Sequence, residues 1–272
     1  MIKAVFVDID DTLTNGQKEI TKETKAAINN CIKKNIKIIL ASGRSREEAI
    51  ALGKEIGASP YIISSNGASC YDAEKNKEIY NESLSKKTVL KLLKYVNENE
   101  YKMKLNYKDK VVLNIAFYPD EKDKELPISE LEKIIEIEDI VQCVVSNRDL
   151  KKMQDFKKYL EENLEEYFKE VKIVNESKKL KNPNLKPSRN YYCDITSKKV
   201  SKGNAVKKIC DYFGIKTDEI ITIGDGENDI SMFEITPNSI AMGNAVLIAK
   251  KVAKYETTSN DENGVAKVLN RL

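Results

Sequence analysis

Carboxylate side chains gather at two places in this sequence, each directly after a short apolar run. The first cluster, Asp8, Asp10 and Asp11, follows the run Ala4–Val7. The second cluster occupies residues 224–229 and follows a run that is rich in isoleucine. Carboxylates packed together repel one another unless a cation neutralises them, and Mg²⁺ prefers such oxygen ligands. The two clusters therefore predict a binding site for a divalent cation, with Mg²⁺ as the candidate.

Two simpler explanations compete for the first cluster. Acids after a strand can serve only as a turn or as a helix cap. Asp8, Asp10, Thr12 and Glu19 also fall at positions 1, 3, 5 and 12 of a calcium-binding loop. Position 6 of such a loop requires glycine but is Leu13 here, and the preceding residues are typical of a strand. The calcium loop is therefore disfavoured.

The composition excludes several kinds of chemistry. The chain has 272 residues and no histidine, which removes histidine-based triads and most zinc sites. Acid–base chemistry is left to carboxylate, lysine, tyrosine or cysteine side chains, and a metal-bound carboxylate can serve as a nucleophile. The formal net charge is +3 and the lysines are scattered among acids. We therefore expect no nucleic-acid partner.

The sequence also indicates the cellular compartment of the protein. No apolar run reaches the roughly 18–20 residues of a membrane span, and the first strand begins at once, without a signal peptide. Five cysteines are scattered and never form a CxxC pair, which indicates reduced thiols. These features predict a cytoplasmic protein without a membrane partner. Because no apolar stripe forces a stable assembly, we expect a monomer or a weak homodimer.

The segments that would position the acids alternate between strands and helices. We expect further strands at 36–40, 61–64 and 220–223, and helices that begin after Thr21, Ser45 and Ser201. This alternation predicts an α/β protein with a doubly wound parallel sheet, that is, a Rossmann-like core. The carboxyl ends of parallel strands share one rim of such a sheet. Ser42, which follows the second strand, should therefore lie near Asp8.

The pattern changes between residues 83 and 195, where hairpins mix with helices. We expect a helix that begins after Ser85, strands at 102–106, 111–117 and 140–145, helices at 129–137 and 149–168, and a closing strand pair at 171–174 and 191–195 around a polar loop. This mixture predicts an α+β domain inserted into the parallel domain. The expected division is residues 1–82 and 196–272 for the core and residues 83–195 for the insert.

Two further side chains belong to the predicted rim. Ser42 taken alone could be an ordinary turn hydroxyl. Lys202 falls in the first turn of an expected helix, where a cation opposes the helix dipole by about 0.3–1 kcal/mol. A lysine at that position is easier to explain if it faces an anion.

Four motifs occur in order along the chain. They are Asp8-Ile9-Asp10-Asp11-Thr12, Ala41-Ser42-Gly43-Arg44, Ser201-Lys202-Gly203 and Gly224-Asp225-Gly226-Glu227-Asn228-Asp229. Together they resemble the motifs of the haloacid dehalogenase-like hydrolases, and the insert resembles a type II cap, subtype IIB. Ser65-Asn66-Gly67 and Asn263-Gly264-Val265 make the chain similar to the Cof-type branch of that family. The sequence departs from the family pattern at Asp11, where glycine is frequent, and at Ser42, where threonine is frequent.

The resemblance implies a role for each matched residue. Asp8 would attack phosphorus and form a phosphoaspartate, and Asp10 would serve as general acid and base. Mg²⁺ would be held by Asp8, the backbone carbonyl of Asp10 and Asp225, and Asp229 would either ligate the ion as well or support the other ligands. The phosphoryl group would be bound by Ser42, Gly43, Arg44, Asn66, Lys202 and Asn228, of which Ser42 and Lys202 would also be catalytic.

The resemblance thus implies a Mg²⁺-dependent phosphatase that hydrolyses small phosphorylated metabolites such as sugar phosphates, nucleotides or cofactors. Two alternatives stay open at this level. A phosphotransferase or phosphomutase of the phosphomannomutase-like type would need the same first step. A phosphate-binding module without turnover would have no chemical need for Asp10.

Overall fold

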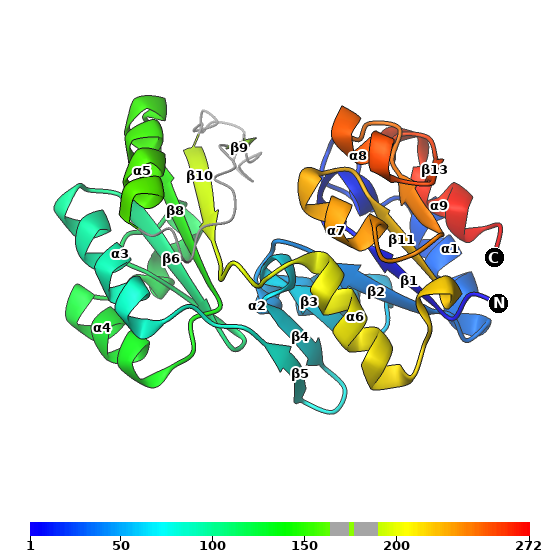
Figure 1. The fold of residues 1–272 in the computed structure, drawn as a ribbon, viewed down its shortest axis with the longest axis horizontal. Helices are drawn as coiled ribbons and strands as arrows, with labels where there is room; N and C mark the ends of the chain where they lie inside the picture. The colour runs from blue at the N-terminus through cyan, green and yellow to red at the C-terminus, as the bar shows by residue number, and fades with distance from the viewer. Residues whose placement is uncertain (164–173, 177–189) are drawn as a thin grey trace. The chain divides into compact units, whose positions relative to one another are not determined.

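The computed structural model describes residues 1–163, 174–176 and 190–272. The chain divides into two compact units, a core unit of residues 1–81 and 200–272 and an inserted unit of residues 82–199 (Figure 1). Each unit has its own cluster of buried apolar side chains. The predicted fold class, an α/β core with an inserted α+β domain, is confirmed.

The core unit is built on one sheet with the strand order β13-β12-β11-β1-β2-β3-β4-β5. Neighbouring strands are parallel from β13 through β3. The bounds of these parallel strands are Ala4–Val7 (β1), Lys37–Ala41 (β2), Tyr61–Ser64 (β3), Ile220–Gly224 (β11), Ser239–Ala241 (β12) and Tyr255–Glu256 (β13). Strand β1 pairs with β2 on one side and with β11 on the other, so the two acidic turns begin on adjacent strands.

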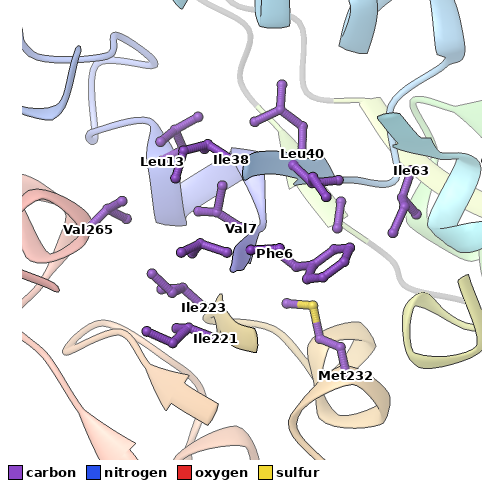
Figure 2. Close-up of a cluster of buried hydrophobic side chains, with 14 of the residues drawn as sticks. Phe6, Val7, Leu13, Ile38, Leu40, Ile63, Ile221, Ile223, Met232 and Val265 are labelled. Carbon is purple, nitrogen blue, oxygen red and sulfur yellow. The ribbon is translucent and has the colours of Figure 1, made fainter. Parts of the chain in front are cut away.

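Strand β1 is buried on both faces because helices cover the sheet on both sides. Phe6 and Val7 are consecutive, so their side chains point to opposite faces. In Figure 2 Phe6 points toward Met232 of α7 (Ile230–Phe233), whereas Val7 lies on the side of Val265 of α9 (Gly264–Leu269). A continuous apolar run is what a parallel strand between two helical layers requires.

The other helices of the core unit are α1 (Lys22–Lys33), α2 (Arg46–Ile56), α6 (Lys202–Phe213) and α8 (Leu247–Val252). Local capping explains where three of them begin. The hydroxyls of Thr21 and Ser201 accept hydrogen bonds from backbone N–H groups in the first turns of α1 and α6. Ser45 and Glu48 form a capping box at the start of α2. These three helix starts agree with the sequence-based expectation.

The core sheet also contains an antiparallel hairpin that the sequence pattern did not reveal. Strands β4 (Ser69–Asp72) and β5 (Lys77–Asn81) extend the sheet beyond β3. Their turn is set by Asp72, whose carboxylate accepts hydrogen bonds from the N–H groups of Glu74 and Lys75. Strand β5 lies at the sheet edge and is partly exposed, so it lacks the apolar run that marks the parallel strands.

The inserted unit is an antiparallel sheet with the strand order β7-β6-β8-β10-β9. The bounds are Lys102–Tyr107 (β6), Lys110–Leu113 (β7), Gln142–Asn147 (β8), Val174–Glu176 (β9) and Asn190–Ile195 (β10), with helices Lys86–Glu98 (α3), Ile128–Ile137 (α4) and Leu150–Asn163 (α5). Apolar residues of these helices and of one sheet face form the larger buried cluster of this unit, and Leu113, Phe117 and Tyr118 form a smaller one. Within the described ranges, no helix is long and apolar enough to cross a membrane.

Strand β7 is shorter than the expected strand 111–117, because it ends at Leu113. At the next residue, Asn114, the backbone N–H still donates to the carbonyl of Met103 at 3.2 Å, but the side chain takes the other contacts: Oδ1 accepts from the N–H of Met103 at 2.7 Å and Nδ2 donates to the carbonyl of Tyr101 at 3.0 Å. A side-chain amide that binds the neighbouring strand interrupts the ladder. The expected continuation of α5 to residue 168, the start of the strand 171–174 and most of the polar loop lie outside the described residues.

Candidate active site

The predicted site residues of the core unit lie at the carboxyl ends of adjacent parallel strands. Asp8 directly follows β1, and its backbone N–H donates to the carbonyl of Ile223 in β11 at 3.0 Å. Ser42 follows β2 and Asp225 follows β11. In open α/β sheets this rim is where ligands bind.

Lys202 joins the two acidic turns through a buried bridge of charges. It is the first residue of α6, and its Nζ donates to Asp8 Oδ1 at 2.5 Å and to Asp229 Oδ1 at 2.6 Å. The Lys202 side chain is 0% exposed, and those of Asp8 and Asp229 are 9% and 1% exposed. The anion that this lysine was expected to face is thus a pair of carboxylates within the protein.

The electrostatics of this bridge are unbalanced. Burial, followed by the nearby charges of Asp229 and Asp225, raises the pKa of Asp8 well above its ordinary value although Lys202 opposes the shift. Burial alone would lower the pKa of Lys202, but the two carboxylates outweigh it and raise this pKa, so the lysine carries its charge. One cation therefore faces three carboxylates. A further positive charge would be favourable here.

Asp229 organises the second acidic turn with its other oxygen. Oδ2 accepts from the backbone N–H groups of Asp225 at 2.9 Å and Gly226 at 2.8 Å. Gly224 permits this contact, because a Cβ atom there would lie 2.4 Å from Cγ of Asp229. Both Asp229 oxygens are thus engaged within the protein.

Asp225 is held by Thr12, a residue of the first motif for which the resemblance implies no role. The Thr12 hydroxyl donates to Asp225 Oδ1 at 2.7 Å. Burial raises the pKa of Asp225 to about 6, a shift that the Thr12 hydrogen bond opposes and the charges of Asp229 and Asp11 reinforce. The only signal in the sequence was the position of Thr12 two residues after Asp10, which puts it on the same rim.

Asp10 is paired with Arg44, a residue that was expected to bind phosphate. The guanidinium donates from Nε to Oδ2 at 3.0 Å and from Nη2 to Oδ1 at 2.8 Å, so the pair is bidentate. Burial by itself would raise the pKa of Asp10, but the hydrogen bonds and charge of Arg44 outweigh it and lower the pKa. The two side chains keep 35% and 30% of their surface exposed, so a ligand can reach them.

Asp11, the residue that departs from the family pattern, takes a left-handed conformation with φ 59°. Glycine adopts this conformation at little cost, which explains why a glycine suits the position. The exposed Asp11 side chain accepts from Lys18 Nζ at 3.0 Å. This ion pair keeps its carboxylate engaged outside the Asp8–Lys202–Asp229 bridge.

The remaining predicted phosphate-binding residues meet around Asn66. Its side-chain Oδ1 accepts from Asn228 Nδ2 at 3.1 Å, and its backbone N–H donates to the carbonyl of Ser42 at 3.0 Å. A Cβ atom on Gly43 would lie 3.0 Å from Asn66 Oδ1, so glycine allows the close approach. The Ser42 hydroxyl accepts from the N–H of Arg44 at 3.2 Å. Turns 42–44, 65–67 and 226–228 are thereby brought together.

The carboxylates of Asp8, Asp225 and Asp229 form a candidate metal site. One oxygen of each lies within 4.8 Å of the others. Oδ2 of Asp8 and Oδ2 of Asp225 accept no hydrogen bond from the described part of the chain, unlike both oxygens of Asp229. Two available carboxylate oxygens and an excess of negative charge suit a hard divalent cation. The residues present therefore fit the predicted cofactor.

Comparisons with known proteins assign the chain to a family. The family model for haloacid dehalogenase-like hydrolases matches residues 5–269, so the chain belongs to this family of hydrolases. The sequence-based recognition is confirmed by this match.

Two similar proteins of Bacillus subtilis strain 168 cover the chain throughout. Phosphatase YwpJ is 26% identical, with 100% of both chains covered. The 5-amino-6-(5-phospho-D-ribitylamino)uracil phosphatase YwtE is 26% identical, and the match covers 100% of this chain and 98% of that protein. A solved structure of the HAD subclass IIB sugar phosphatase BT4131 shares the fold, with a TM-score of 0.77, 22% identity and coverage of 99% and 98%.

Proposed function

We propose that this hydrolase is a Mg²⁺-dependent phosphatase that transfers the phosphoryl group of a small phosphorylated metabolite to Asp8 and then to water. The observation that carries the proposal is the arrangement of Asp8. Its Oδ1 is held by the buried Lys202 at 2.5 Å, and its Oδ2 accepts no hydrogen bond from the described residues. An oriented carboxylate with one available oxygen at the rim is suited to nucleophilic attack.

In the first step Asp8 Oδ2 forms a bond to phosphorus while the bond from phosphorus to the leaving oxygen breaks. Asp10 gives its proton to that leaving oxygen as the alcohol departs. In the second step Asp10 takes a proton from water, whose oxygen attacks phosphorus and releases Asp8. The same carboxyl group can serve both steps, because the proton that it takes from water in the second step replaces the one that it gave to the leaving oxygen in the first.

Asp225, the backbone carbonyl of Asp10 and Asp8 would hold the metal ion. Asp8 would do so through Oδ1, which can bind the ion beside Lys202, so that Oδ2 stays available for the attack. When bound, Mg²⁺ would neutralise charge on the carboxylates and on the phosphoryl oxygens. Asp229, whose two oxygens hold Lys202 and the turn at Asp225, would fix the positions of the ligand residues without binding the ion itself. Lys202, the Ser42 hydroxyl, the N–H of Gly43 and the Asn228 amide would orient the phosphoryl group.

The substrate class rests on the relatives. The three relatives described above are named phosphatases, and two of those names specify a phosphorylated ribitylaminouracil and sugar phosphates. We therefore expect a phosphorylated sugar, polyol or related metabolite. The inserted unit is proposed to act as the cap that selects it.

The test is phosphate release from a panel of phosphorylated sugars, nucleotides and cofactors, with Mg²⁺ and with EDTA. Release that requires Mg²⁺ supports a phosphatase. Isomerised sugar phosphate without free phosphate would instead support the mutase alternative. Binding without any product would support the non-catalytic module.

The raised pKa of Asp225 gives a pH prediction. A carboxyl group with a pKa of about 6 is protonated below that pH, and a proton competes with the metal ion. The Mg²⁺ concentration for half-maximal activity should therefore rise as pH falls below 6, by about tenfold per pH unit.

Asp225→Asn provides the matched variant, because the amide cannot titrate. It should need at least about tenfold more Mg²⁺ at pH 7.5, with a weaker pH dependence of this requirement. Titrations of activity with Mg²⁺ from pH 5 to 8 measure both. An Asp225→Asn enzyme with the wild-type Mg²⁺ requirement would remove Asp225 from the metal site.

Loss of Arg44 should change the pH profile in a defined direction. Arg44 lowers the pKa of Asp10, so in Arg44→Ala the effect of burial is unopposed and this pKa rises. Since Asp10 must be protonated to act as an acid, activity falls as pH rises through its pKa. The alkaline limb of kcat/KM should shift upward by about one pH unit in Arg44→Ala and by less in Arg44→Lys. An unmoved limb in Arg44→Ala would contradict this.

A further inference from the structure

A group of side chains from the end of the sequence holds the loop that follows Asp10. We call these four residues the C-terminal clamp: Asn244, Asn260, Asp261 and Asn263. Their contacts are Asn244 Nδ2 to the carbonyl of Asp11 at 2.7 Å, Asn260 Nδ2 to the carbonyl of Thr14 at 2.9 Å, the N–H of Gly16 to Asp261 Oδ1 at 2.8 Å, and the Thr21 hydroxyl to Asn263 Oδ1 at 2.7 Å. The contacts are thus spread along the whole loop.

The clamp is itself fixed by close backbone approach. Asn244 Oδ1 accepts from the N–H of Asn260 at 3.0 Å, which joins the two clamp segments. A Cβ atom on Gly243 would lie 2.6 Å from the N atom of Ser259, and one on Gly264 would lie 2.2 Å from the carbonyl oxygen of Thr258. Only glycine fits at both positions. The motif Asn263-Gly264-Val265 has no role in the proposed mechanism. In the structure its Asn263 binds Thr21, and its Gly264 allows the close approach of Thr258.

The backbone that the clamp holds is strained where it leaves Asp10. Within the helical turn Ile9–Leu13, Asp10 has φ −77° and ψ 128°, and Asp11 has φ 59° and ψ 9°. A non-glycine residue in the left-handed region is disfavoured and persists only when its surroundings hold it. The contact from Asn244 is made to the carbonyl of Asp11 itself. This carbonyl belongs to the peptide that joins Asp11 to Thr12. A shift of that peptide would change the conformation of Asp11 and thereby the direction of the Asp10 side chain.

We propose that Asn244, supported by Asn260, is a positioning residue that keeps Asp10 aimed at the leaving oxygen. The inference rests on the proposed function, because it assigns Asn244 an effect through the general acid. It predicts a specific kinetic signature. Loss of Asn244 impairs proton donation and leaves the attack by Asp8 intact.

Two phosphate esters separate these steps. An alkyl phosphate such as glycerol 2-phosphate releases an alkoxide, which must be protonated as the bond to phosphorus breaks. p-Nitrophenyl phosphate releases a phenolate that is stable without a proton. A misplaced general acid therefore slows the first ester and spares the second.

The experiment measures kcat/KM for both esters with saturating Mg²⁺ in the full chain. Asn244→Ala removes both hydrogen bonds of the side chain. Asn244→Asp keeps an acceptor for the N–H of Asn260 and loses the donor to Asp11. We expect both variants to lose about tenfold on the alkyl ester and less than about threefold on the aryl ester, a part of the 10²–10⁴-fold that a general acid contributes.

Asn238→Ala is the matched control. Asn238 Nδ2 also donates to two backbone carbonyls in the core unit, those of Asp218 in the preceding turn and of Ile220 at the start of β11, both at 3.0 Å. Its loss should lower thermal stability about as much as Asn244→Ala and leave the ratio of the two kcat/KM values unchanged. A ratio that changes equally in Asn238→Ala, or an equal fall on both esters in Asn244→Ala, overturns the proposal.

Asp10→Asn separates failure of this inference from failure of the proposed function. If Asp10→Asn loses activity selectively on the alkyl ester but Asn244→Ala does not, Asn244 does not position the acid and only the inference falls. If Asp10→Asn shows no selectivity, Asp10 is not the general acid. The proposed mechanism then falls together with the inference.

Discussion

Asp8→Asn should abolish phosphate release, with kcat at least about a thousandfold below wild type, and should leave the fold intact. The amide cannot attack phosphorus, because it lacks the negative charge of the carboxylate. The amide nearly matches the carboxylate in size, so the packing at the end of β1 is preserved. Lys202 also keeps its second partner, Asp229, at 2.6 Å.

Stability should not suffer in this variant. Burial raises the pKa of Asp8, which means that its negative charge is costly in the folded protein. A neutral side chain avoids that cost and gives up one of the two ion pairs of Lys202. We expect the midpoint of thermal unfolding to stay near the wild-type value or to increase. Circular dichroism measures this, alongside the phosphate assay.

The control is Asp211→Asn, which removes an exposed carboxylate from α6 and should leave both activity and stability unchanged. A rapid-quench experiment adds a direct test of the intermediate. Wild-type protein mixed with substrate should gain the mass of one phosphoryl group, and Asp8→Asn should not. Turnover that survives in Asp8→Asn would remove the nucleophile assignment.

Lys202→Met should cost both activity and stability. The side chain is fully buried and holds two carboxylates, so its loss leaves Asp8 and Asp229 buried without a countercharge. Breaking a buried ion pair in this way typically costs about 3–5 kcal/mol of unfolding free energy. Activity should fall by at least about a hundredfold, because a charge that stabilises the phosphoryl oxygens is also lost.

Urea unfolding and kinetics on the same preparations measure the two effects. Lys207→Met, an exposed lysine of the same helix, is the control and should change the unfolding free energy by less than about 0.5 kcal/mol. Adding Asp8→Asn to Lys202→Met should restore part of the stability, because one unpaired charge is removed. A Lys202→Met protein as stable as the control would show that the buried bridge contributes nothing to stability.

Features that depend on neighbouring residues could be predicted from the sequence. The run at β1 is buried because all four of its residues are apolar, and helices α1, α2 and α6 begin after the hydroxyl residues that cap them. The hairpin β4–β5 was missed because its edge strand mixes polar and apolar residues, so no periodic pattern marks it. The length of β7 was overestimated because the side chain of Asn114 competes with the ladder.

The partners within the site could not be predicted from spacing. Arg44 was expected to meet phosphate, yet its side chain holds Asp10, 34 positions earlier in the chain. Asp229 was expected either to ligate the metal or to support its ligands, and its two oxygens contact Lys202 and the N–H groups of its own turn. Its place among the ligands stays a prediction. The clamp joins Asn244 to Asp11, 233 positions apart.

The sequence by itself determined the class of this protein, because the acids, the lysine and the strand ends of the four motifs are local and follow in order. It also determined the α/β core, since burial on both faces requires the continuous apolar runs that the sequence contains. Only the tertiary structure decided which oxygen of each carboxylate is engaged and which remains available. Hydrogen bonds and charges act over a few ångströms in space, and the distance between two residues along the chain does not determine that separation.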